Sequence, residues 1–241
     1  MTDKNSPSRY IIIPARRNSS RFNGKPLAEI NGVPMIAHAA KLATESALAS
    51  VVVVVSDDCE ILETAKKVGN VMPVHGEGEF ANGTERVARF ARQLERDATI
   101  CILQCDEVTI AGRDLDLAMA LAERNYQAML TVASRKPSRE VGDDDVMLDL
   151  DSCGRVTRFA RGDDSAAHHH VGVYVAGNAL LQRYAELEPS PAETTERLEQ
   201  LRWSHHGIAI NCLTLPIDTE SVNRPEDIYK VERLMASRNR G

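Results

Sequence analysis

Residues 51–55 read Val-Val-Val-Val-Val, an unbroken run of β-branched side chains. A strand that is apolar on both faces is typical of the middle of a parallel sheet with helices packed on either side. Upstream, Tyr10–Pro14 reads YIIIP and predicts a neighbouring strand that ends in a turn. Downstream, Asp57 and Asp58 predict the cap of a helix that continues to about Val68. The centre of the fold is therefore predicted to be a sheet covered by helices.

Strand and helix patterns alternate outward from this centre. Helices are expected at 34–48, 58–68, 83–93 and 113–123, among strands expected at 10–14, 51–55, 71–74, 99–104 and 128–133. Such repeated units predict an α/β fold, Rossmann-like, with a mostly parallel, doubly wound sheet.

The pattern changes after Lys136, where short strands and turns predict a small strand-rich insertion. The remaining elements are expected as strands at 145–150, 155–160, 171–175 and 208–213 and as helices at 178–186, 191–204 and 225–237. The chain carries neither an internal repeat nor a low-complexity linker, so its 241 residues are predicted to form a single domain, 1–241.

Composition argues against several functional classes. The net charge is −6, from 29 Lys and Arg against 35 Asp and Glu, which disfavours a general nucleic-acid binder. The five cysteines are odd in number and form no CxxC pair, so neither a disulfide framework nor a zinc site is indicated, and we expect buried or partly buried thiols. The apolar runs are far shorter than the ~20 residues that span a bilayer, and residues 1–9 lack an apolar signal core. We therefore expect a cytoplasmic protein without a membrane partner.

The loop after the first expected strand is rich in cations. In an open parallel sheet, ligands bind beyond the carboxyl ends of the strands. Residues 14–27 begin at such an end and hold Arg16, Arg21 and Lys25 within ten residues. Fixed cations together with loop N–H groups suit a polyphosphate, which we favour over a merely solvated basic turn.

Two further segments at expected strand ends are ambiguous on their own. Residues 103–108 end a strand in two adjacent carboxylates, Asp106 and Glu107, which are suited either to hold Mg²⁺ against bound phosphates or to cap a helix. Residues 82–86 read NGTER; Gly83 permits a close backbone approach, but the segment is equally suited to begin a capped helix.

Taken together, these segments resemble one family. PAR at 14–16 with GKPL at 24–27, GTER at 83–86, and Gln104 with Asp106-Glu107 are similar to the motifs of the 3-deoxy-manno-octulosonate (Kdo) cytidylyltransferases, the CMP-Kdo synthetases. HVGVY at 170–174 and LEQLR at 198–202 extend the similarity over nearly the full length. The resemblance implies a fold of the nucleotide-diphospho-sugar transferase type, a homodimer, and transfer of CMP from CTP to a small anionic acceptor with release of pyrophosphate.

The resemblance also implies roles for individual residues. Arg16, Lys25 and Asp106 are expected to carry catalysis by positioning and charge neutralisation. The expected nucleotide-binding residues are Ala15, Arg16, Arg21, Lys25, Asn82, Gly83 and Thr84. The expected acceptor-binding residues are Gln104, His170, Tyr174, Glu199 and Gln200. The expected cofactor is Mg²⁺, with Asp106 and Asn223 as its ligands.

Three departures from the family pattern concern the acceptor side and the metal site. Cys105 stands where the family has Gly, and Asn223 stands where it usually has a second metal-binding Asp. The segment 158–170 is also much shorter than its counterpart. An Asn can still provide a neutral oxygen, and Asp218 or Glu220 is a candidate to restore the lost charge.

These departures leave the acceptor open between a Kdo-like sugar acid and a small phosphonate such as phosphonoformate. The shortened segment and Asn223 predict a small, cationic acceptor pocket lined by Arg161, His170 and Arg158, which would suit a compact dianion. The alternative from another class is a nucleotide-binding homologue with impaired catalysis. The presence of Arg16 and Lys25 together with a carboxylate at position 106 argues against that alternative.

Overall fold

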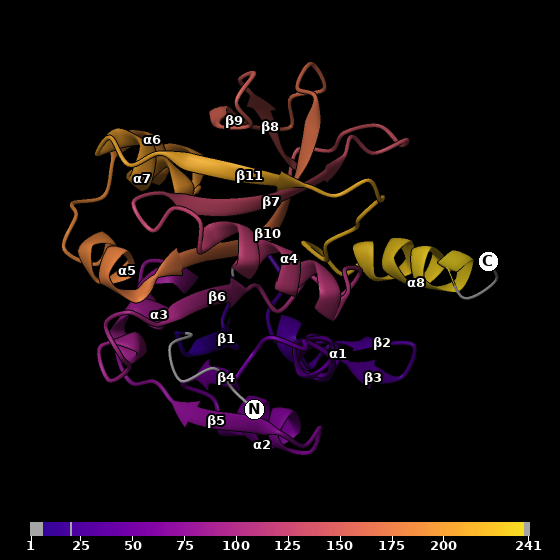
Figure 1. Ribbon diagram of the computed structural model, residues 1–241. Helices are drawn as coiled ribbons and strands as arrows, with labels where there is room; N and C mark the ends of the chain where they lie inside the picture. The colour runs from indigo at the N-terminus through magenta and orange to yellow at the C-terminus, as the bar shows by residue number, and fades with distance from the viewer. Residues whose placement is uncertain (1–6, 20, 239–241) are drawn as a thin grey trace.

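A central sheet runs through the molecule with helices on both of its faces (Figure 1). The computed structural model describes residues 7–19 and 21–238. The strands follow the order β11-β7-β10-β6-β1-β4-β5, and all of them are parallel except β10. Their bounds are β11 Ile210–Thr214, β7 Met129–Arg135, β10 His168–Gly177, β6 Thr99–Leu103, β1 Arg9–Ala15, β4 Val51–Ser56 and β5 Val71–His75. The predicted α/β fold with a mostly parallel sheet is confirmed.

The side chains of the central strands alternate between two apolar cores. Ile11 and Ile13 of β1 face a core formed with α1 (Met35–Thr44), α2 (Cys59–Lys66), α4 (Gly112–Ala122) and α8 (Asp227–Arg238). Ile12 and Val53 face the opposite core, formed with α3 (Gly83–Ala91), α5 (Asn178–Tyr184) and α7 (Gln200–His205). Residues 52–55 are buried on both faces of the sheet, which is why that run is apolar throughout.

Strand β10 brings the insertion into the sheet. It lies between β6 and β7 and is antiparallel to both. Its first residues also pair with β8 (Val146–Leu150), which forms a hairpin with β9 (Val156–Arg161). This hairpin stands above the rest of the sheet in Figure 1 and corresponds to the predicted strand-rich insertion. Because β10 runs against its neighbours, its amino-terminal residues reach the edge at which the parallel strands end.

Some local expectations are wrong. The helix expected at 191–204 is two short helices, α6 (Pro191–Glu196) and α7, because Arg197 adopts a left-handed backbone with φ 53° between them. Cys59 and Cys153 are exposed, whereas the other three thiols are buried or partly buried. Three short elements were not anticipated: η1 (Lys25–Leu27), β2 (Glu29–Ile30) and β3 (Val33–Pro34). In the described part of the chain, none of the helices is long and apolar enough to cross a membrane.

Candidate functional site

A cavity of about 640 Å³ opens at the carboxyl ends of β1 and β6. Strands β4 and β5 follow β1 on one side of it in the sheet, whereas β6 pairs with β1 on the other side. The cavity therefore lies at the point where the strand order reverses. This is the usual ligand site of an open α/β sheet. Every residue predicted for the site lines the cavity except Thr84, which is buried, and Arg158.

Lys25 and Asp106 form an ion pair in the cavity wall. Lys25 lies in the turn η1 after β1, and Asp106 lies in the loop after β6. The Lys25 ammonium group donates to the Asp106 carboxylate and, at 3.0 Å, to the Val222 carbonyl. Burial opposes the charge of Lys25, but the Asp106 carboxylate outweighs it and raises the Lys25 pKa above its ordinary value. The pair therefore joins the cationic loop, the carboxylate loop and the segment that carries Asn223.

Further cations surround the mouth of the cavity. Arg16 is exposed and lines it. Arg21 pairs with Asp144 at 2.7 Å, and Arg224 donates to the other oxygen of the same carboxylate. Arg161 of β9 donates to the Asp144 carbonyl at 2.9 Å. The cationic loop, the loop between β7 and β8, and the segment before α8 thus meet at Asp144.

The NGTER segment forms a tightly held turn at the start of α3. The Asn82 side chain accepts a hydrogen bond from the Glu85 N–H at 2.9 Å, and its amide nitrogen donates to the Tyr184 hydroxyl and to Glu193. A Cβ at Gly83 would lie 3.0 Å from the Gln104 amide nitrogen. The close approach that was predicted for Gly83 is therefore an approach to Gln104 within the protein.

Apart from Arg161, the predicted acceptor residues form a polar cluster in the cavity wall that consists of two hydrogen-bonded groups. The Gln104 amide donates to Glu199 at 3.2 Å, and Glu199 also accepts from the Thr84 N–H at 3.1 Å. Burial raises the pKa of Glu199 to about 7. Gln200 donates to the Tyr174 hydroxyl, and the His170 and Tyr174 rings stack with centroids 5.5 Å apart.

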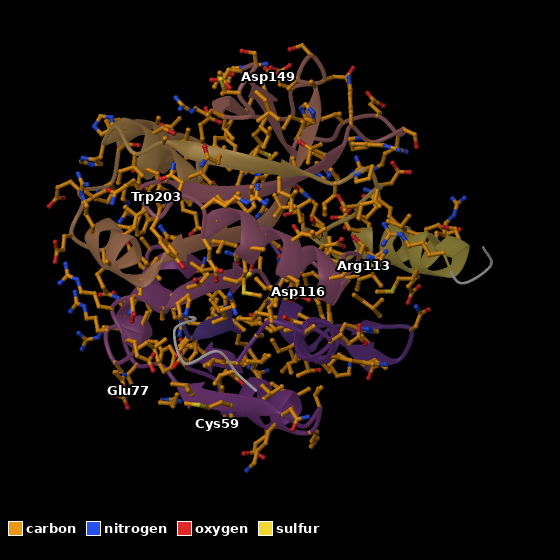
Figure 2. The ribbon with its side chains drawn as sticks, viewed as in Figure 1. Cys59, Glu77, Arg113, Asp116, Asp149 and Trp203 are labelled. Carbon is orange, nitrogen blue, oxygen red and sulfur yellow. The ribbon has the colours of Figure 1, made fainter. Side chains whose placement is uncertain are left out.

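The expectation of a small, cationic acceptor pocket lined by Arg161, His170 and Arg158 is wrong in two respects. Burial lowers the pKa of His170 to about 3, so this ring is neutral at physiological pH. Arg158 does not line the cavity and instead pairs with Asp149 and Asp163. Asp149 lies on the hairpin at the outer end of the molecule (Figure 2). Of the three expected groups, only Arg161 contributes a positive charge to the cavity wall.

The positions that depart from the family pattern have different surroundings. Cys105 is buried, and burial raises its pKa to about 12, so it packs as a neutral thiol. Asn223 lines the cavity, and its backbone N–H donates to Asp227 at 3.0 Å. Glu220 is bound to Arg139 through both carboxylate oxygens, so it is not available to replace the charge missing at Asn223.

Several lining residues were not predicted for the site. Arg197 reaches the cavity because of the left-handed break between α6 and α7, and no local sequence pattern indicated that break. Asp144 belongs to an acidic run at 143–145, which reads as a solvated loop in the sequence. In the sequence, Glu107 is indicated only by its position next to Asp106, and that pair of carboxylates is the available signal.

Comparison with known proteins gives a consistent result. Residues 10–210 match the family model described as Cytidylyltransferase. The 3-deoxy-manno-octulosonate cytidylyltransferase of Chlorobaculum tepidum is 35% identical over 95% of this chain and 97% of its own length. The corresponding enzyme of Pelodictyon phaeoclathratiforme is 34% identical over 94% of this chain and 97% of its own length.

Solved structures agree with the sequence comparison. A structure of CMP:2-keto-3-deoxy-manno-octonic acid synthetase complexed with CTP superposes with a TM-score of 0.82 at 28% identity, covering 96% of this chain and 99% of the other. A 4-diphosphocytidyl-2C-methyl-D-erythritol synthase superposes with a TM-score of 0.65 at 15% identity over 95% of this chain and all of the other, which indicates a shared fold.

Proposed function

The chain belongs to the cytidylyltransferase family and is a CTP-dependent cytidylyltransferase, and from this premise we propose that it couples CMP to a Kdo-like sugar acid. One observation carries the proposal. A single cavity holds the cations Arg16 and Lys25 beside Asp106, and it also holds a polar cluster that includes Gln104 and Glu199. This arrangement supports a nucleotide half and an acceptor half that adjoin in one cavity.

The proposed reaction is an in-line attack of an acceptor oxygen on the α-phosphorus of CTP. The new P–O bond forms as the bond to the pyrophosphate oxygen breaks, and pyrophosphate carries away the electron pair of that bond. The proton of the acceptor hydroxyl leaves to the solvent. Arg16 and Lys25 stabilise the charge that develops on the phosphate oxygens, and the loops hold the reactants in line. The reaction needs no covalent enzyme intermediate, so neither Cys105 nor a serine nucleophile is required.

The residues at the site fit Mg²⁺, which we propose as the cofactor. The Lys25 ammonium group contacts both the Asp106 carboxylate and the carbonyl of Val222, which precedes Asn223. Asp106 and Asn223 therefore lie near each other and can both offer oxygen ligands. Among residues 7–19 and 21–238, no group of three or more His, Cys, Asp or Glu could hold a metal by itself. Mg²⁺ at nucleotide sites binds through one or two carboxylates plus substrate phosphates. Asp106 and Asn223 would hold it, and it would neutralise phosphate charge.

The polar cluster favours a hydroxylated acceptor. His170 is neutral, and Tyr174 and Gln104 are uncharged hydrogen-bonding groups. The Gln200 side-chain oxygen is buried and has no hydrogen-bond partner among the described residues. Unpartnered buried polar groups disfavour a ligand that cannot satisfy them. A sugar acid brings hydroxyl groups to this cluster and a carboxylate to Arg161.

A small phosphonate is the second candidate, and a specific observation favours it. Arg21, Arg161 and Arg197 all line the cavity, and Asn223, which also lines it, supplies no negative charge. A doubly charged acceptor would match this balance better than a singly charged one.

A pyrophosphate-release screen tests the proposal. The enzyme is incubated with Mg²⁺ and CTP, UTP, ATP or GTP, each with Kdo, phosphonoformate or no acceptor. We expect release with CTP and Kdo well above the level without acceptor. Release with phosphonoformate but not with Kdo would replace the sugar acid by the second candidate. Binding of CTP without release for any acceptor would instead indicate a homologue with impaired catalysis.

A further inference from the structure

Glu107 is a buried carboxylate in the cavity wall to which the proposed reaction gives no role. It follows Asp106 directly in the chain, is 4% exposed and lines the cavity. Asp106 faces Lys25, whereas Glu107 contacts other segments of the site. The two adjacent carboxylates therefore have separate partners.

One carboxylate oxygen of Glu107 ties three segments together. Oε1 accepts a hydrogen bond from the Gly172 N–H at 2.8 Å in β10 and from the Ser221 hydroxyl at 2.7 Å. Ser221 lies two residues before Asn223. Glu107 thus connects the loop that carries Asp106 both to the inserted strand and to the segment that carries Asn223.

The tie to β10 is close enough to require a glycine. A Cβ at Gly172 would lie 3.0 Å from Oε1 of Glu107 and 2.9 Å from the Gln104 side chain. The Gly172 carbonyl also accepts a hydrogen bond from the Gln104 N–H at 2.9 Å. The register of β10 against β7 shifts just here, between Val171 and Tyr174. The loop of residues 104–107 therefore binds both the N–H and the carbonyl of Gly172 at the bulge in β10.

The other oxygen of Glu107 is left without a donor. Oε2 is buried and has no hydrogen-bond partner in the described part of the chain. A buried carboxylate oxygen without a donor is costly, so a donor brought by the bound substrates would be expected to meet it. The deprotonated phosphates of CTP offer only acceptors, whereas Mg²⁺ bound to phosphates keeps several water molecules, which are donors.

Other carboxylates of the cavity wall are already engaged at both oxygens. Arg139 donates hydrogen bonds to both carboxylate oxygens of Asp145. Arg21 and Arg224 each donate to one carboxylate oxygen of Asp144. Glu199 accepts from Gln104 and from the Thr84 N–H. Among the described carboxylates of the cavity wall other than Asp106, Glu107 therefore keeps an oxygen without a hydrogen-bond partner.

We propose that Glu107 is a positioning residue of the transfer site. Its Oε1 holds the Ser221–Asn223 segment against the Asp106 loop. With the divalent cation bound, its Oε2 would accept a hydrogen bond from water that the cation carries, and its carboxylate would supply near the metal site the negative charge that Asn223 lacks. Groups in this outer position orient the ligands and tune metal affinity. The inference rests on the proposed function, because it assumes that Mg²⁺ binds between Asp106 and Asn223.

Metal-dependent CTP binding by the Glu107→Gln variant tests this inference. The substitution keeps the size and the Oε1 acceptor, but it replaces the free oxygen by an N–H donor. CTP affinity is measured by calorimetry in EDTA and across a Mg²⁺ series. In EDTA we expect the variant to bind CTP within about twofold of the wild type. We expect the Mg²⁺ concentration at half-maximal enhancement to rise on the order of 10-fold to 100-fold.

Two results would overturn the inference. One is a Mg²⁺ midpoint equal to that of the wild type. The other is an equal loss of CTP affinity with and without Mg²⁺, which indicates a purely structural role. Should the Glu107→Gln variant fail to fold, the Ser221→Ala variant takes its place in the test. It removes the bond between Glu107 and the Asn223 segment, so we expect the Mg²⁺ concentration at half-maximal enhancement to rise a few-fold. No rise would refute the proposal. A wild type that binds CTP equally with and without Mg²⁺ would refute the proposed metal site itself.

Discussion

Replacing Lys25 by Met is expected to lower both activity and stability. Lys25 and Asp106 belong to loops, and loop residues often tolerate substitution with little loss of stability. Here, however, their side chains are only 14% and 17% exposed, and each neutralises the other. Without the ammonium group, the Asp106 carboxylate faces the cavity without its cation, and the Val222 carbonyl loses a donor at 3.0 Å.

The size of each effect follows from the burial of the pair. Breaking a fully buried ion pair costs about 3–5 kcal/mol, and an exposed pair contributes about 0–1 kcal/mol. The intermediate burial of Lys25 and Asp106 places the expected loss of unfolding free energy at about 2 kcal/mol. Removing a cation that stabilises developing phosphate charge costs on the order of 3 kcal/mol in the barrier, or ~100-fold in rate.

A double-mutant cycle separates the two effects. Urea unfolding and pyrophosphate release are measured for Lys25→Met, Asp106→Asn and the double variant. The double variant should recover about 1–2 kcal/mol relative to the sum of the single losses, because no unpaired charge remains, yet it should stay inactive. Lys41→Met, on the exposed side of α1, is the control and should change stability by less than about 0.5 kcal/mol. Strictly additive stability losses, or activity retained by the double variant, would refute this reasoning.

Three further outcomes are expected. Burial raises the pKa of Glu199 to about 7, so the unfolding free energy of the wild type should fall by about 3 kcal/mol more than that of Glu199→Gln as the pH rises from 5 to 8. Equal dependence on pH in urea unfolding of the two proteins would contradict this. Gly172→Ala should lower the melting temperature and acceptor turnover together, because its Cβ would lie 3.0 Å from Glu107; an unchanged melting temperature would show that the loop yields freely. Arg202→Met should cost about 3–5 kcal/mol in urea unfolding, because Arg202 is 2% exposed and pairs with Glu193; a loss below about 1 kcal/mol would refute that.

Much of the fold was predictable because its signals are local. The valine run at 51–55 is apolar on both faces and therefore predicts a strand covered on both sides. Alternating strand and helix patterns then predict winding on both faces of a mostly parallel sheet. The carboxyl ends of such strands lie at one edge, so the Lys25 loop and the Asp106 loop were expected to meet. The ion pair between those two residues is the consequence in the structure.

The acceptor half depended on contacts that no local pattern specifies. An apolar strand reads the same in either direction, so nothing in residues 168–177 indicated that β10 would run antiparallel between β6 and β7. That direction brings His170 and Gly172 to the ligand edge. Burial there makes His170 neutral, which corrected the expectation of a cationic pocket.

Local sequence patterns specify which elements form and which loops meet at the ligand edge, because helix, strand and turn preferences depend on neighbouring residues. The partners of Glu107 depend instead on contacts between distant segments. Its hydrogen bonds to Gly172 and Ser221 span 65 and 114 positions of the chain. Its other oxygen has no partner among the described residues, which can be recognised only when the surrounding segments are in place. Desolvation, ion pairing and hydrogen-bond satisfaction depend on everything packed around a group, and that environment exists only in the folded chain.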